Sequence, residues 1–265
     1  MPRLPAARYL EHLRADSRRF RDVLADCDPA ARVPGCPDWT AADLLWHLAE
    51  VQWFWAWVVE NRPSEPAEDQ PGPDRPDTYA GLVAAFDDHS ARLVAALETA
   101  DPAEHAWSWS ADHTVGFTHR RQAHEALIHR LDAEQTAGEV TPLDPMLAAD
   151  GVEECLDVMF GGTPPWGRFE PGPGHVRVDL SDTGHSIWVQ VGMFRGTNPA
   201  DGVNHDGTDI RVVADPAHPA DVVVSGTAAA LDGWLWRRTG DEQLTVEGDR
   251  AVYKQFREAV SHPID

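Results

Sequence analysis

The chain has 265 residues, enough for one large domain or two of ordinary size, and 42% of them are hydrophobic, which excludes wholesale disorder. Lysine and arginine together number 22 against 44 acidic residues, so the formal net charge is −22. A surface this negative repels phosphate backbones and anionic lipid, and we therefore expect neither a nucleic-acid nor a membrane partner.

The cysteines and the apolar segments indicate a cytoplasmic protein. Cys27, Cys36 and Cys155 form no CxxC pattern and are too few for a disulfide framework. The N-terminal segment lacks the unbroken apolar stretch of a signal peptide. The most apolar stretch, residues 44–59, is shorter than the ~20 residues that cross a bilayer. These features leave the oligomeric state open.

The first half of the chain has the periodicity of four amphipathic helices, which predicts a helical bundle. Thr40 has the features of an N-cap, with Asp43 as its capping-box partner. A turn is expected at residues 33–39, a proline-rich acidic loop at 61–77 and irregular structure at 101–119. The helices themselves are expected at residues 5–27, 40–60, 78–99 and 120–136.

The second half begins with a predicted helix at residues 146–160 and a linker or exposed loop at 161–174. Short segments of alternating polarity follow, which are typical of antiparallel strands. These segments are HVRVDL, SIWVQVG, DIRVVA and ADVVVSG, between residues 175 and 226.

A helix capped by Thr227 is expected to run to about Arg238, followed by a short strand at QLTVEGD and a last helix at residues 250–260. Strands followed by helices indicate an α+β domain. The predicted fold class is therefore α plus α+β: a four-helix bundle at residues 1–142 and a smaller α+β domain at residues 143–265, without internal repeats.

Candidate metal ligands occur in the predicted second and fourth helices. Glu125 and His129 are one helical turn apart, so their side chains point the same way and can share one divalent metal. His47, near the edge of the second helix's apolar stripe, is the candidate third ligand. Three protein ligands leave positions for water or substrate, which is the pattern of a catalytic site.

The spacing alone leaves alternatives open, because a Glu–His pair one turn apart is common on surface helices. His124 lies closer to the apolar stripe of its helix and is either a ligand or a core histidine. Asp132 either orients a ligand or pairs with an arginine, Arg130 or Arg121. His105, His113 and His119, in the segment before the helix, are further candidate ligands.

The tryptophans also have two interpretations. They either line an apolar substrate pocket beside the metal or pack in the core and between domains. Those concerned are Trp46, Trp53, Trp55, Trp57, Trp107 and Trp109.

Two motifs resemble a known family. VPGCPDWTAADLLWHLAEVQWFW resembles its V-P-x-C-P-x-W-T…L-x-x-H-L signature, and RRQAHEALIHRLDAE its H-E-x-x-x-H-R-x-D signature. The family is that of the mycothiol-dependent maleylpyruvate isomerases, within the DinB/YfiT-like superfamily. The later segment VSGTAAALDGWLWRRTGDEQLTVEGD resembles the family's C-terminal domain, which is similar to sterol-carrier-like α+β modules. The resemblance spans nearly the whole chain in the right order.

The resemblance implies a metal site and an arginine. In the family the bundle binds a divalent metal, usually zinc, through residues that match His47, Glu125 and His129. Arg238 matches an arginine that the family can turn toward an anionic substrate, and is the candidate catalytic residue. The family usually has a glycine before this arginine where the chain has Arg237, so either arginine is a candidate for that role.

The resemblance further implies an enzyme, a metal- and thiol-dependent isomerase or S-transferase acting on a small electrophile. A thiol bound to a divalent cation loses its proton near neutral pH. Addition of the thiolate to a double bond, rotation and elimination give isomerisation, and addition alone gives conjugation. None of the three cysteines has the features of a nucleophile, so mycothiol or a similar thiol is the expected cosubstrate.

Two other functions are compatible with the sequence, since a scaffold does not determine its chemistry. One is a metal-dependent hydrolase, which needs no thiol. The other is a binding protein whose C-terminal domain holds an apolar ligand, independently of the metal ligands. The electrophile, the thiol and the metal are not specified by any residue pattern.

Overall fold

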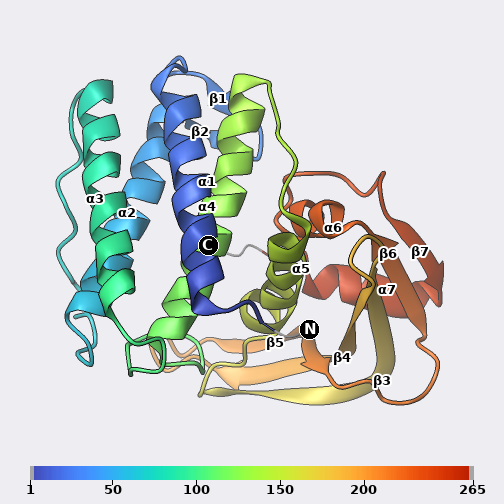
Figure 1. Cartoon of the computed structure of the whole chain (residues 1–265). Coiled ribbons are helices and arrows are strands. Elements are labelled where there is room, and N and C mark those ends of the chain that lie inside the picture. The colour runs from blue at the N-terminus through green and yellow to red at the C-terminus, as the bar shows by residue number, and fades with distance from the viewer. Residues whose placement is uncertain (1–2, 263–265) are drawn as a thin grey trace. The chain divides into compact units, whose positions relative to one another are not determined.

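The computed structural model describes residues 3–262, which form two compact units. The bundle unit is Leu4–Leu143, coloured blue to green in Figure 1, and the sheet unit contains residues 144–262 together with Arg3. Within residues 3–262, no helix is both long and apolar enough to cross a bilayer.

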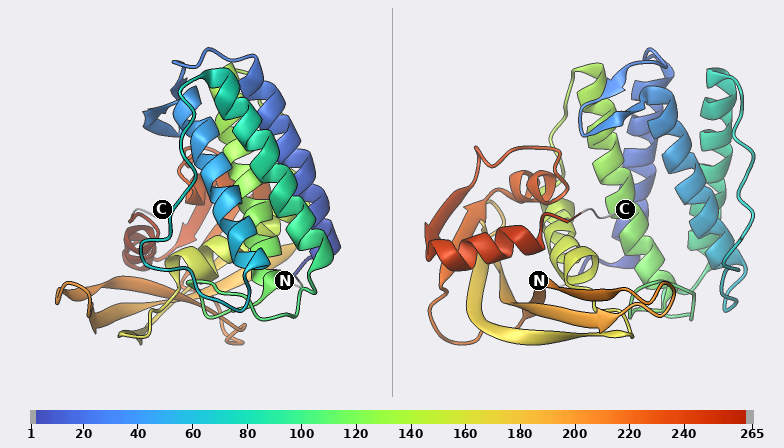
Figure 2. Two further views of the ribbon diagram at one scale, coloured as in Figure 1. Left: turned by 90° about the vertical axis from the view of Figure 1, so that its left-hand side faces the viewer. Right: turned by 180° about the vertical axis from the view of Figure 1, so that it is seen from behind.

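Four long helices build the bundle unit (Figure 2), which confirms the predicted bundle. Helix α1 packs mainly on α4 and α2 mainly on α3, while smaller contacts of α1 with α3 and of α2 with α4 close the ring. The rings of Phe20 and Phe86 lie 5.0 Å apart within the core. The helices are α1 (Ala6–Ala25), α2 (Ala41–Glu60), α3 (Tyr79–Thr99) and α4 (Val115–Ala137).

Helix α4 begins five residues earlier than predicted, at Val115 instead of Arg120. Thr114 caps it, because its hydroxyl accepts a hydrogen bond from the backbone N–H of Phe117 at 3.2 Å. Gly116 in this first turn lowers the helix propensity, which conceals the start in the sequence. His119 therefore lies on α4 and not in a loop.

Residues 33–39, predicted as a turn, contain most of a short hairpin made by β1 (Arg32–Val33) and β2 (Cys36–Thr40). Strand β2 leads directly into α2, so Trp39 and the cap residue Thr40 are held by the hairpin at the start of the helix. The two prolines in this stretch suggested a turn only, because proline is rare inside strands.

Thr40 and Asp43 form the predicted capping box of α2. The Thr40 hydroxyl accepts from the Asp43 N–H at 3.3 Å, and the Asp43 carboxylate accepts from the Thr40 N–H at 3.0 Å. Arg75 also donates to this carboxylate at 2.8 Å. The Thr40 hydroxyl and N–H, followed by Arg75, lower the pKa of Asp43 to about 2.

We expect Thr40→Ala to destabilise the protein by about 1 kcal/mol near neutral pH, measured by urea denaturation. Asp43 titrates at lower pH in the folded protein than its unfolded value of about 3.9. Its contribution is therefore present above that value and is lost as the pH falls toward 2. Thr78→Ala, at a cap whose hydroxyl accepts only from Gly81 among its described bonds, is the matched control. A Thr40→Ala deficit that stays constant down to about pH 2 would contradict the role of the carboxylate.

The sheet unit is built on a five-stranded sheet with the order β5-β4-β3-β6-β7. Strands β3, β4 and β5 form an antiparallel meander, but β6 pairs with β3 in parallel, so the prediction of antiparallel pairing is wrong for this pair. Alternating polarity indicates which side chains lie on each face of a strand, but it does not indicate which other strand pairs with it. The strands are β3 (Gly167–Leu180), β4 (His185–Thr197), β5 (Asn204–Val213), β6 (Val222–Gly226) and β7 (Thr245–Gly248).

The prediction of a linker or loop at residues 161–174 is wrong for the second half of this segment, because β3 begins at Gly167. Its register with β4 shifts between Pro171 and His175, which marks a β-bulge. A bulge tolerates prolines, which lack the N–H of a regular ladder. The Gln190 side chain of β4 donates to the Gly172 carbonyl at 2.9 Å across this bulge.

The helices of the sheet unit complete the predicted α+β architecture. The helix expected at residues 146–160 is divided into a regular helix and a π-helical turn. Thr227 caps α6 as predicted, but α6 ends at Leu235, before Arg238. Helix α7 packs against strands of the sheet (Figure 1). The elements are α5 (Pro145–Glu154), η1 (Cys155–Phe160), α6 (Ala228–Leu235) and α7 (Arg250–Ala259).

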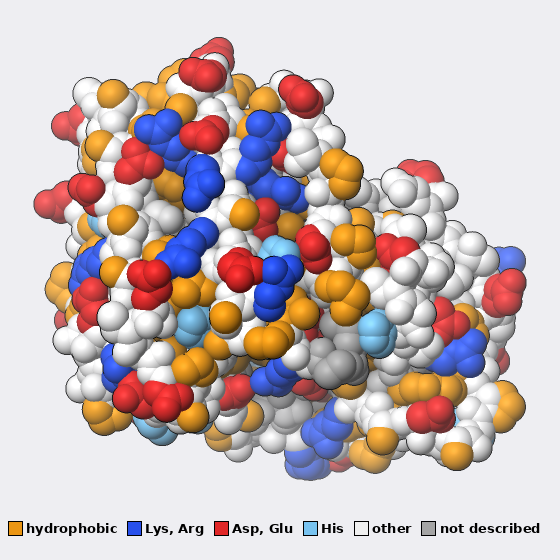
Figure 3. Space-filling view, viewed as in Figure 1, with side chains coloured by type: hydrophobic (Ala, Val, Ile, Leu, Met, Phe, Trp, Pro, Cys, Tyr) orange, Lys and Arg blue, Asp and Glu red, His pale blue; other side chains and the backbone are white. Residues whose placement is uncertain are grey.

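Charges of both signs are mixed on the surface of the bundle unit. Figure 3 shows acidic and basic side chains interspersed over α1 and α3. Arg21 of α1 contacts Asp87 of α3 at 3.0 Å, and Arg14 pairs with Glu98. On this face the negative net charge is therefore not gathered into a single acidic patch.

Candidate metal centre

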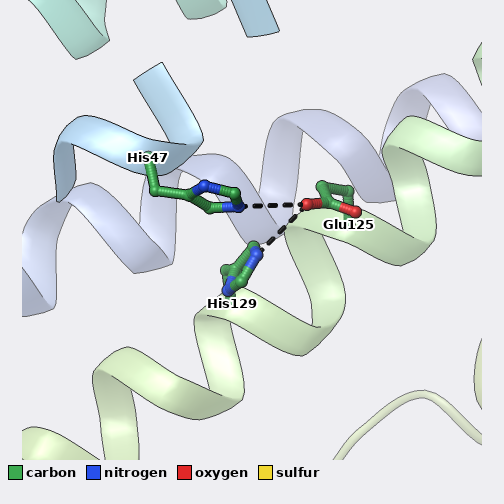
Figure 4. A group of neighbouring side chains, drawn as sticks. All are labelled: His47, Glu125 and His129. Carbon is green, nitrogen blue, oxygen red and sulfur yellow. Dashed lines mark hydrogen bonds and ion pairs between the residues drawn. The ribbon is translucent and has the colours of Figure 1, made fainter. Parts of the chain in front are cut away.

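Helices α2 and α4 bring His47, Glu125 and His129 together in the bundle unit (Figure 4). Glu125 Oε1 lies 3.1 Å from His129 Nε2 and 3.5 Å from His47 Nε2. Figure 4 shows both imidazoles directed toward this carboxylate. One donor atom from each residue lies within 4.8 Å of the other two, and among the described residues this is the one such group of three.

The donor atoms suit a divalent metal in chemistry and spacing. Two imidazole nitrogens and one carboxylate oxygen are ligands that zinc and several other divalent metals accept. With metal–ligand bonds of roughly 2.1 Å, neighbouring ligands of a tetrahedral ion lie about 3.4 Å apart. The two distances to Glu125 Oε1 bracket this value. The three residues therefore fit the metal that the sequence predicts, and two of them come from one face of α4.

The centre is partly open. The His47 side chain is 33% exposed and Glu125 is 18% exposed, whereas His129 is 8% exposed. The group is therefore most exposed to solvent at His47. Burial alone would raise the pKa of the Glu125 carboxyl, but hydrogen bonds with His129 and His47 and the charge of Arg121 hold this pKa well below its usual range. The carboxylate is ionised, as a metal ligand must be.

His129 is held from both sides by carboxylates. Its Nδ1 lies 2.9 Å from Asp132 Oδ2, and its Nε2 lies 3.1 Å from Glu125 Oε1. Burial would lower the pKa of this imidazole, but hydrogen bonds to Asp132 and Glu125 outweigh it and raise the pKa to about 9. Of the two open interpretations of Asp132, this contact with His129 favours orientation of the candidate ligand. Arg130 contacts Asp16 at 3.3 Å.

Two residues beside the centre, Arg121 and Trp39, are not predicted as site residues from the sequence. Arg121 is predicted only as a possible partner of Asp132, and Trp39 only as part of a motif. Arg121 Nη2 donates to Glu125 Oε2 at 3.0 Å. The Trp39 ring lies 4.7 Å from the His47 ring and 6.3 Å from the His129 ring, between centroids. The spacing of four residues between Arg121 and Glu125 is the sequence feature that could have indicated the Arg121 contact. For Trp39, that feature is its place in the VPGCPDW motif.

The other candidate histidines lie outside the group. The buried His124 ring lies 6.1 Å from the Tyr9 ring. His119 is buried on α4, and burial lowers its pKa. His105 and His113 stack on each other in the loop before α4, with ring centroids 5.8 Å apart.

The tryptophans named in the sequence analysis make their described ring contacts away from the metal ligands. Trp46 belongs to the buried core of the bundle. Trp55 is buried against Trp107 and Phe117, at 6.2 Å and 5.9 Å between centroids. Trp109 is half exposed and meets the edge of Phe117. A pocket-lining role for these residues stays a prediction.

Arg238 lies in the sheet unit just after α6, where the chain forms a Schellman motif. The Arg238 N–H donates to the Gly233 carbonyl at 2.7 Å, and the Arg237 N–H donates to that of Trp234 at 3.0 Å. Arg237 has φ +59°, the left-handed conformation that glycine adopts most easily. This is the position at which the family usually has glycine. Arg238 is half-buried and its Nη1 donates to the Trp236 carbonyl at 2.6 Å.

We expect Arg237→Gly to stabilise the protein by about 1 kcal/mol, because it removes the left-handed strain of a side-chain-bearing residue. The contact that Arg237 makes with the His262 carbonyl is exposed and contributes little. Thermal denaturation measures the change, and Arg238→Gly at the next position is the control, for which no gain is expected. A lower melting temperature in Arg237→Gly would contradict the strain argument.

The fold and the site together define the class: a helical bundle that carries a His–Glu–His group, followed by an α+β unit. Residues 10–134 match the family model of the mycothiol maleylpyruvate isomerase N-terminal domain, and residues 146–255 match that of the C-terminal domain. The chain belongs to the mycothiol-dependent maleylpyruvate isomerase family.

Solved structures show the same fold. The chain resembles a mycothiol-dependent maleylpyruvate isomerase with a TM-score of 0.57, and a histidine-to-alanine mutant of such an isomerase with a TM-score of 0.61. Each match has 14% sequence identity and covers 92% of this chain and 93% of the other. No curated protein matches the chain significantly.

Proposed function

We propose that the protein is a metal- and thiol-dependent isomerase or S-transferase that acts on a small electrophile, with mycothiol or a similar thiol as cosubstrate. Membership of the family supports the thiol-dependent isomerase. The observation that carries the metal dependence is the convergence of His47, Glu125 and His129 from two helices, with donor atoms within 4.8 Å of one another.

In this proposal His47, Glu125 and His129 hold the metal, which is most simply zinc. A bound divalent metal lowers the pKa of a thiol and polarises a carbonyl oxygen. Glu125 supplies a negative charge and Asp132 fixes the orientation of His129. The half-buried Trp39 ring lies beside the two imidazoles, with its centroid 4.7 Å from that of His47 and 6.3 Å from that of His129.

The reaction needs no oxidant or reductant. The thiolate adds to the double bond of an α,β-unsaturated carbonyl compound, which forms a C–S bond and moves an electron pair onto the carbonyl. The former double bond rotates as a single bond. The C–S bond then breaks, the double bond returns in the other geometry, and the thiolate is released. If a proton traps the adduct instead, the product is the S-conjugate.

The cysteines of the chain support an external thiol. Burial, followed by the charge of Asp28, raises the pKa of Cys27, which disfavours its thiolate. Cys36 packs against the core cluster of the bundle, and Cys155 is buried in the sheet unit. None of the three belongs to the group of candidate metal ligands.

The proposal extends to the organisation and location of the protein. We assign metal binding to a domain of residues 1–142 and keep residues 143–265 as the α+β domain. The role of Arg238 in binding an anionic group of the substrate stays a prediction, and so does the cytoplasmic location. The three free cysteines are compatible with a reducing compartment.

The decisive experiment is an isomerisation assay of zinc-loaded protein. The substrate is a cis α,β-unsaturated 2-oxo acid such as maleylpyruvate, and its ultraviolet absorbance is measured over time. Mycothiol, glutathione or no thiol is added in parallel. We expect turnover only in the presence of a thiol, and loss of turnover after treatment with a chelator. Analysis of the products distinguishes the trans isomer from the S-conjugate.

Other outcomes identify the alternatives. Hydrolysis of an ester or amide by the zinc-loaded protein without thiol would contradict the proposal and favour a metal-dependent hydrolase. Binding of an apolar ligand that persists after chelation, without turnover of any electrophile tested, would favour a binding protein.

A further inference from the structure

The two oxygens of the Glu125 carboxylate have different partners. Oε1 faces the imidazoles, at 3.1 Å from His129 Nε2 and 3.5 Å from His47 Nε2. Oε2 accepts a hydrogen bond from Arg121 Nη2 at 3.0 Å. One oxygen of the Glu125 carboxylate therefore faces the candidate metal position, and the other binds the guanidinium of Arg121, one turn earlier on α4.

We propose that Arg121 is a positioning residue that restricts Glu125 to one oxygen ligand, Oε1, and so keeps positions on the metal open for the thiol and the substrate. This inference rests on the proposed metal-dependent function.

Burial makes the contact between Arg121 and Glu125 strong. The Arg121 side chain is 4% exposed and Glu125 is 18% exposed, so water and salt screen the pair less than a surface ion pair. A guanidinium does not lose its proton in proteins. Arg121 therefore remains a fixed positive charge beside Oε2, and its spacing of four residues on the same helix holds the geometry.

Binding of both carboxylate oxygens to one metal would bring the metal to Oε2, the oxygen that already accepts the hydrogen bond from Arg121. Two positive charges, the metal and the guanidinium, would then lie against one oxygen in a partly buried site, where their repulsion is weakly screened. Binding through Oε1 alone keeps the pair intact, and the distances of both imidazoles to Oε1 already favour this oxygen.

Single-oxygen binding has a consequence for the reaction. With two imidazole nitrogens and Oε1, the protein supplies three donor atoms, and a divalent ion that accepts four or five ligands keeps one or two positions. A second oxygen from Glu125 would occupy one of them. Arg121 is thus a determinant of whether a thiol and a carbonyl oxygen can be held side by side.

The first test is made on the parent protein, so it does not depend on how a variant folds. Zinc X-ray absorption of the loaded protein reports the number of nitrogen and oxygen ligands and whether the carboxylate carbon lies close to the metal, as it does when both oxygens bind. We expect a single oxygen from Glu125. Zinc bound through both oxygens would overturn the inference while leaving the proposed function intact.

The second test uses Arg121→Met and Arg121→Gln, loaded with cobalt(II) as a spectroscopic substitute. The visible absorption of cobalt weakens as its coordination number rises. We expect loss of intensity in either variant that folds, because the second oxygen is then free to bind. Arg19→Met is the matched control: Arg19 pairs with another carboxylate of α4, Glu134, at 2.7 Å, and the parent spectrum is expected.

The outcomes separate the inference from the function on which it rests. If the parent binds neither zinc nor cobalt, the proposed function fails and the inference fails with it. If the parent binds metal and the spectrum is unchanged in a folded Arg121 variant, the inference alone is overturned. A merely structural role for Arg121 would lower thermal stability without changing the cobalt spectrum.

Discussion

Glu125→Ala is expected to abolish stoichiometric metal binding and to lower the thiol-dependent rate by on the order of 10³-fold, since the metal supplies several kcal/mol of transition-state stabilisation. Glu125 is the residue that both imidazoles share, because His47 and His129 contact the same oxygen. Its removal leaves two imidazole nitrogens from two different helices and no negatively charged donor atom among the candidate ligands. Elemental analysis of protein purified without an affinity tag measures the effect, and about one equivalent is expected in the parent.

The substitution also removes the ion pair between Glu125 and the buried Arg121, so stability is measured alongside metal content. Glu125→Gln keeps the shape of the side chain and is expected to lose the metal with less damage to the fold. His113→Ala is the control, because His113 is exposed and its ring stacks on His105. A Glu125→Ala variant that retains one equivalent of metal would show that the metal, if present, is bound elsewhere.

The helices were predictable from the sequence because they carry strong local signals. Thr40 with Asp43, Thr78 and Thr227 each cap a helix in the structure. The failures occurred where tertiary structure outweighs local preference. Pro171 would exclude a regular strand, but the bulge in β3 accommodates it. The parallel pairing of β3 with β6 depends on contacts between residues more than forty positions apart, which no local pattern contains.

The candidate site was predictable only in part, because one pair of its residues depends on local spacing and the third residue depends on how two helices pack. The i, i+4 spacing of Glu125 and His129 determines that their side chains share a face of α4. The approach of His47 depends on how α2 packs on α4, and from the residues alone it was one option among several histidines. Asp132 lies one turn from His129, and Arg121 lies one turn from Glu125, the candidate ligands that they contact. From the sequence, Asp132 can either orient a ligand or pair with an arginine, and only the three-dimensional structure distinguishes the two.

The second large effect is expected at Asp132. This residue is fully buried, and its Oδ2 lies 2.9 Å from His129 Nδ1. A carboxylate in this position holds the proton of a neutral imidazole on Nδ1, which leaves the lone pair of Nε2 for the metal, and it makes the ring a stronger donor. We therefore expect Asp132→Ala to weaken metal binding by about 10–100-fold, measured by competition with a chelator.

Asp132→Asn separates orientation from charge. The amide oxygen of asparagine still accepts the Nδ1 proton but carries no negative charge, so an intermediate loss of affinity is expected. If Asp132 acts only through His129, adding Asp132→Ala to a His129→Ala variant will produce no further loss of the residual affinity. An equal loss in both backgrounds would instead mean that Asp132 stabilises α4 independently of the imidazole. Because the Thr136 hydroxyl bonds to the backbone carbonyl of Asp132, that contact survives either substitution and does not confuse the comparison.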